Sequence, residues 1–178
     1  MSKISLNFLF ANFVLICCLS AFVRAESPPE EKKSDDAALE RTRKQVQMLD
    51  DIYKTSIVLI TENYVNDKDD LAAGVAFKKL FEAVKKKGWH EVRLIDATGE
   101  PYNDDNAPAD DFEKEAIKQI KGGKPYFDKV VEKDGKRYLR ATTIIPVVMD
   151  KCVICHDNYK EAKKGEAIGA LGYIVPIE

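Results

Sequence analysis

The spacing of apolar residues divides the chain into a helical first part and a second part dominated by strands. From Ala37 to Val65 apolar residues recur every three or four positions, which predicts an amphipathic helix. A second helix with the same period is predicted from Leu71 to about Lys87. Gly88 follows three lysines there, and cations and a glycine both suit the C-terminal end of a helix.

After Gly88 the period changes to two, which is typical of strands with one buried face. The predicted strands are Trp89–Ile95, Tyr126–Glu132, Lys136–Val147 and Ala167–Pro176, with a helix at about Asp110–Ile120 between the first two. Asp134-Gly135 separates the middle strands and favours a tight hairpin turn. The predicted fold class is therefore α+β: N-terminal helices followed by an antiparallel sheet with flanking helices.

The first 25 residues have the composition of a secretory signal peptide. Lys3 supplies a positive start, and the run from Leu6 to Val23 contains no charged residue. We expect cleavage before Glu26. An uncleaved membrane anchor, or lipidation at Cys17 or Cys18, are the alternatives. The predicted localisation is periplasmic, with no stable membrane insertion after cleavage, because no other segment is long and apolar enough to cross a bilayer.

The rest of the chain has the size of one domain. Residues 26–36 are polar and charged and are predicted to form a flexible leader. Residues 37–178 are expected to fold as a single unit, with a helical part at 37–87 and a sheet part at 88–178. Across all 178 residues, 30 Asp and Glu are interspersed with 28 Lys and Arg. This balance argues against nucleic acid as a partner.

The strongest motif is Cys152-Val153-Ile154-Cys155-His156, the attachment pattern of a c-type haem. Two thiols at this spacing can each bond one vinyl group of the porphyrin, and His156 can bind the iron as its proximal ligand. The expected cofactor is one covalently attached haem c. Bacteria attach this cofactor outside the cytoplasmic membrane, which agrees with the predicted export of the chain. A thioredoxin-like pair would instead be expected near the start of a βαβ unit. A structural zinc site would need four ligands, and the chain after the signal peptide has no second pair of cysteines or histidines to complete one.

The distal iron ligand is harder to predict from the residues. Met48, on the first helix, is the candidate that we place first. The alternatives are water, an empty position, or one of several other side chains: His90, Met149, Lys54, Tyr53 and Tyr64. A methionine ligand would raise the reduction potential, whereas an open position would admit small gases.

From about Leu71 to its end the chain resembles the Tll0287-like family, exported haem-c domains with a PAS-like fold. The resemblance depends on the haem motif and on the order of several other features: Asn106-Ala107-Pro108, the helix with Glu113, the strands with Tyr138 and Arg140, Pro146, and the closing strand from Gly165 to Pro176. It implies an antiparallel sheet flanked by helices and one haem c. Some members use a helix cysteine as distal ligand, and Ala72-Ala73-Gly74 has none at the matching place.

These observations predict a periplasmic monohaem c-type cytochrome that transfers one electron at a time to an unidentified redox partner protein. The alternative is a PAS-like module that senses redox state or a gas through its haem and acts through a partner. We expect no enzymatic activity, since no acid–base pair is evident near the motif. A homodimer through the first helix is also considered.

Overall fold

The computed structural model describes residues 31–67, 71–153 and 159–178. The predicted signal peptide, Cys155 and His156 lie outside the described residues, and of residues 31–36 and 153 the backbone alone is described. The helices are α1 (Glu31–Tyr64), α2 (Ala73–Lys86) and α3 (Asp111–Lys121), with 3₁₀ turns η1 (Asp104–Asn106) and η2 (Asp150–Val153). The strands are β1 (Glu91–Asp96), β2 (Tyr126–Lys133), β3 (Lys136–Pro146) and β4 (Ala167–Pro176).

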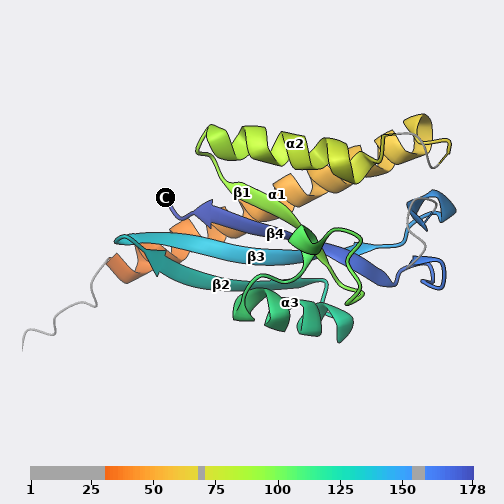
Figure 1. The fold of residues 1–178 in the computed structure, drawn as a ribbon. Helices are drawn as coiled ribbons and strands as arrows, with labels where there is room; N and C mark the ends of the chain where they lie inside the picture. Colours follow the sequence, from red (N-terminus) through yellow and green to blue (C-terminus); the bar gives the residue numbers. More distant parts are fainter. Residues whose placement is uncertain (1–30, 68–70, 154–158) are drawn as a thin grey trace, which may run out of the picture.

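The four strands form one antiparallel sheet in the order β1-β4-β3-β2 (Figure 1). The predicted α+β class, with helices first and an antiparallel sheet flanked by helices, is confirmed. The last strand pairs with the first, so β4 lies in the interior of the sheet. Its burial along almost the whole length follows from this position.

Successive side chains of each strand point to opposite faces of the sheet, and the two faces are covered by different helices. α1 and α2 cover one face, and the side chains that meet there form the larger core cluster: Val46, Tyr53, Phe77, Phe81, Leu139, Ala141, Leu171, Tyr173 and Val175. α3 covers part of the other face with a smaller cluster: Ile95, Ala97, Ile117, Ile120 and Ala170.

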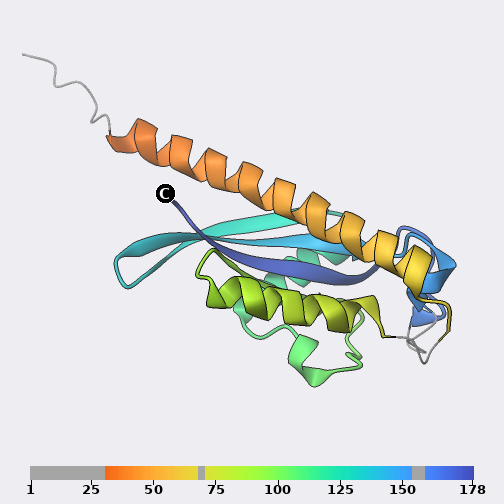
Figure 2. The same ribbon diagram turned by 90° about the horizontal axis from the view of Figure 1, so that it is seen from above.

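The long helix α1 runs along the whole length of the sheet (Figure 2). It begins at Glu31, inside the segment predicted as a leader, six residues before the predicted start of the helix at Ala37. The lysines and glutamate there are good helix formers, and extending an existing helix needs no new nucleation. Among the described residues, no helix is long and apolar enough to span a bilayer.

Polar contacts fix the position of α1 on the sheet. The Asp50 carboxylate accepts hydrogen bonds from Thr143 Oγ1 at 2.5 Å and from the Tyr173 hydroxyl at 3.0 Å. Burial, followed by the nearby charge of Asp50, raises the pKa of Tyr173 far above its ordinary value, so this phenol stays a donor. α1 is therefore held at a defined height along the strands.

The two ends of the sheet are closed by different connections. At one end, which we call the hairpin end, Asp134 and Gly135 both have positive φ, 52° and 70°, in a two-residue turn between paired Lys133 and Lys136. This confirms the predicted hairpin. At the opposite end, the loop end, residues 147–166 connect β3 to β4. The C-terminus of α1 and the start of α2 lie at the loop end (Figure 1).

Candidate functional site

The candidate site is the β3–β4 connection, because it carries the Cys-x-x-Cys-His motif. Its base is closed by two backbone hydrogen bonds: Val147 N donates to Glu166 O at 3.0 Å, and Gly165 N donates to Val147 O at 2.8 Å. Gly165 has a φ of 87°, a backbone conformation that residues other than glycine rarely adopt. The two ends of the connection are thus held together.

Cys152 lies inside this connection, in the short helical turn η2. Its backbone N–H donates to Met149 O at 3.0 Å. The thiol is free and half-buried. The structure therefore gives the first cysteine of the motif a defined backbone position and leaves its sulfur available.

The turn that carries Cys152 is attached to the end of α1 through Lys151. Its ammonium donates to Glu62 O at 2.9 Å and reaches Asn66 Oδ1 at 3.5 Å. A cation is favourable here because the last carbonyls of a helix carry partial negative charge and have no intrahelical donor. This contact ties the motif to the helix that covers the larger core.

On the far side of the motif, Tyr159 lies near the end of β1. Burial, and secondarily the negative charge of Asp96, raise the pKa of its hydroxyl. Asp96 is itself buried and fixed, since it accepts from Thr98 Oγ1 at 2.8 Å and from Gly99 N at 2.6 Å. The described residues on the two sides of the motif thus lie near different elements, Lys151 at the end of α1 and Tyr159 near the end of β1.

The structure does not bring Met48 to this turn. Met48 is 57% exposed on the outer side of α1. It precedes Glu62 by fourteen residues, which is about 21 Å along a helix that rises about 1.5 Å per residue. The neighbouring Leu49 packs against the core instead. The two adjacent positions differ by about 100° around the helix axis, so Leu49 faces the sheet and Met48 does not.

The other proposed distal ligands are also placed by the structure. The Tyr53 hydroxyl and His90 Nε2 are 2.9 Å apart, far along the chain from the motif. Lys54 pairs with Asp50 at 2.7 Å. Tyr64 is 75% exposed at the end of α1. Met149 lies in the β3–β4 connection itself, where its carbonyl contacts Cys152.

Two of the residues that carried the resemblance outside the motif, Glu113 and Arg140, belong to a charged network on the α3 face. Glu113 is buried and accepts from Arg93 and, at 2.7 Å, from Ala109 N. Arg140 pairs with Asp110 at 2.6 Å and lies over the Phe112 ring, 4.4 Å from its centroid. The Arg140 hydrogen bond lowers the pKa of Asp110. This network holds α3 and the segment before it on the sheet.

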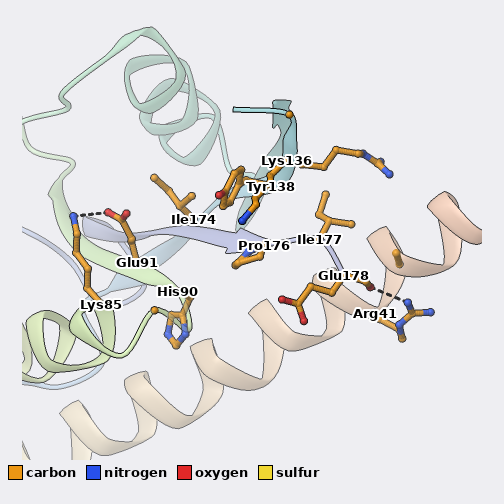
Figure 3. Close-up of a pocket in the computed structure, with 14 residues that line it drawn as sticks. Arg41, Lys85, His90, Glu91, Lys136, Tyr138, Ile174, Pro176, Ile177 and Glu178 are labelled. Carbon is orange, nitrogen blue, oxygen red and sulfur yellow. Dashed lines mark hydrogen bonds and ion pairs between the residues drawn. The ribbon is translucent and has the colours of Figure 1, made fainter. Parts of the chain in front are cut away.

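A pocket of about 870 Å³ opens at the hairpin end (Figure 3), and Cys152 is not among the residues that line it. Two of its basic side chains already have acceptors: Arg41 donates to the backbone oxygen of Glu178 at 2.9 Å, and Lys85 pairs with the Glu91 carboxylate at 2.6 Å. Sequence reasoning missed it, because its lining comes from four separate segments. Among the described residues, no group of three His, Cys, Asp or Glu is arranged for a metal ion.

Comparisons with known proteins agree with this fold. Among solved structures, the crystal structure of the cyanobacterial heme-protein Tll0287 matches with a TM-score of 0.50 and 14% identity, over 84% of this chain and 97% of that chain. At this identity the likeness concerns the fold alone. A search of curated proteins finds no match. The family model described as Tll0287-like matches residues 31–175, and the chain therefore belongs to the Tll0287-like family.

Proposed function

We propose that this protein binds one haem c covalently through Cys152 and Cys155, with His156 as the proximal iron ligand, and that it transfers one electron at a time. The single observation that carries the proposal is a complete Cys-x-x-Cys-His motif inside the part of the chain that matches the family. The similarity to a protein described as a heme-protein supports the same cofactor.

The donor set and the described surroundings fit this cofactor. The Cys152 thiol is free, half-buried and held on a fixed turn, as a thioether anchor requires. Lys151 on one side is hydrogen-bonded to the end of α1, and Tyr159 on the other is half-buried within the electrostatic reach of Asp96. When bound, the haem would supply an iron that cycles between the ferric and ferrous states. The chain's own part is to hold the macrocycle through two sulfur atoms and to present one imidazole.

Haem-based sensing uses the same cofactor and differs in what occupies the distal position. An electron carrier benefits from a position that is filled, because ligand exchange then does not accompany the change of oxidation state. Binding of carbon monoxide by the ferrous protein separates the two functions. We expect no spectral change with carbon monoxide.

The test is production of the full chain in a host that attaches haem in its periplasm. We expect a mass increase equal to one haem after denaturation, and a pyridine spectrum typical of two thioether bonds. Cys152→Ala should shift that spectrum toward one unreacted vinyl group. Met48→Ala is the matched control and should leave all spectra unchanged.

Three results would contradict the proposal. Absence of a covalent tetrapyrrole would exclude haem c. A haem that cannot be reduced and reoxidised reversibly would exclude electron transfer. Strong binding of carbon monoxide would favour sensing. Export, which the proposal requires, is tested by fractionation and by N-terminal sequencing, where a mature protein that begins at Glu26 is expected.

A further inference from the structure

The outer side of α1 carries an aligned stripe of exposed residues that the proposed function does not use. They follow one another at alternating spacings of four and three: Arg41, Gln45, Met48, Ile52, Thr55, Leu59 and Glu62. This is the spacing of the contact seam of a coiled coil. The middle of the stripe is apolar, with Met48 57%, Ile52 52% and Leu59 52% exposed. Single exposed apolar residues are ordinary, but here three share one line along the helix, with the exposed Thr55 between Ile52 and Leu59.

Charged side chains of opposite sign lie at the two ends of the stripe. The exposed Glu40 near its start pairs with Arg43, and the Lys151 ammonium near its end donates to the backbone of Glu62. Arg41 and the neighbouring Lys44 are exposed near the start of the stripe, and Glu62 is exposed at its end. Within the described parts of the chain, neither the Lys44 ammonium nor the Glu62 carboxylate has an ion pair with another side chain. A parallel pairing of two such helices would place like charges together. An antiparallel pairing places each basic end beside an acidic end.

We propose that two copies of this chain pair through the α1 stripe in an antiparallel, two-fold arrangement. With the two-fold axis between Ile52 and Thr55, Met48 lies opposite Leu59 of the second copy, and Ile52 lies opposite Thr55. Each surface patch then meets its own equivalent, as a closed two-fold dimer requires. The occupant of the stripe is thus a second copy, because in this arrangement the basic end of each stripe meets the acidic end of the other and the apolar positions lie between them.

This arrangement has a consequence for the loop ends. Glu62 would lie opposite Gln45 of the second copy, so the two Glu62 residues would be separated by about 25 Å along the helix axes. Because Lys151 attaches the Cys152 turn to Glu62, the two turns would lie at opposite ends of the dimer. Each would remain accessible to a partner. The dimer itself does not depend on the proposed cofactor, and it can be tested whether or not haem is attached.

The first experiment is sedimentation equilibrium on the full chain and on Ile52→Asp, with circular dichroism to verify that both are folded. We expect a dimer at micromolar concentration. Ile52→Asp should raise its dissociation constant by about 100-fold or more, since the aspartate would be buried in the apolar centre. Leu80→Asp is the matched control: Leu80 is 42% exposed on α2, and the dissociation constant should change by less than about threefold.

The second experiment tests the direction of the helices. Lys44→Glu and Glu62→Lys should each weaken the dimer by about tenfold, whereas the double variant should recover most of the wild-type affinity. A double variant as weak as the single variants would overturn the antiparallel arrangement. A wild-type protein that stays monomeric, including one that binds lipid vesicles as a monomer, would overturn the dimer, and so would a folded Ile52→Asp variant with wild-type association.

Discussion

One end of the sheet contains a pocket, and the opposite end carries the cysteine of the haem motif. The hairpin end has the pocket of about 870 Å³, lined by paired charges and backbone. The loop end has the cysteine and, in sequence, the histidine of the motif. A large pocket is often the first guess for a functional site. Here the donor set argues for the other end, because the proposed covalent cofactor would be specified by the cysteines and the histidine that bond to it.

The ends also differ in how they are held. A two-residue turn with local hydrogen bonds closes the hairpin end. The loop end depends on Gly165 at its base, on Lys151 at α1 and on Tyr159 near β1. Its geometry therefore depends on elements that are distant in sequence, and changes there should affect cofactor attachment as well as stability.

The largest expected difference between the ends concerns the two histidines of the chain. His156→Ala should abolish the wild-type spectrum of the ferrous protein, because it removes the proposed iron ligand. His90→Ala, at the hairpin end, should leave that spectrum unchanged, since His90 is bonded to Tyr53. Absorption spectra of both purified variants test this. An altered spectrum in His90→Ala would place the haem in contact with the hairpin end.

The second prediction compares glycines with positive φ at the two ends. Gly165→Ala and Gly135→Ala should each lower the free energy of unfolding by about 1–2 kcal/mol, because alanine is strained in this conformation. No other atoms crowd either position, so backbone strain is the cause. Only Gly165→Ala should also reduce the yield of covalent haem. Denaturant titration and haem content per protein measure the two effects.

Gly74→Ala serves as the control for this pair. Gly74 lies in α2 with ordinary helical geometry, and an added Cβ would make a normal contact with Leu94 at 3.6 Å. It should be neutral or stabilising by up to about 1 kcal/mol. Equal haem yields in all three variants would contradict the special role of the loop base.

A third prediction concerns one lysine at each end. Lys151→Met removes the hydrogen bond to Glu62 O and should cost about 0.5–1 kcal/mol, with faster amide exchange of the Cys152 turn. Lys85→Met removes an exposed ion pair with Glu91 and should change stability by less than about 0.5 kcal/mol. Hydrogen exchange followed by mass spectrometry should localise the first effect to the loop end.

The smallest expected effect is a pH dependence at the hairpin end. Burial lowers the pKa of His90 below its ordinary value near 6.5. The unfolded chain therefore binds a proton at a higher pH than the folded one. His90 stabilises the fold above its unfolded pKa, and that contribution is lost as the pH falls below it. Melting temperatures between pH 7.5 and 5 should fall less in His90→Gln than in the wild type.

The sequence alone determined the elements whose signals are local. The bounds of β4 agree with the prediction at both ends, and Asp134-Gly135 identified the hairpin, because turn chemistry and alternation act over a few residues. The motif at residues 152–156 was equally visible, since covalent attachment requires a fixed spacing. The start of α1 was missed, because its first turns continue a helix instead of nucleating one.

Only the tertiary structure decided which residues of these elements contact one another. The pairing of β1 with β4, the charged network around Glu113 and the anchoring of Lys151 on α1 join residues far apart in the chain. Periodicity showed that α1 is amphipathic, but Ile52 and Leu59, which share the apolar spacing with Leu49, are half exposed, and the angle at which α1 crosses the sheet decides which of these positions is covered. That angle results from the packing of the whole core, and no local pattern contains it.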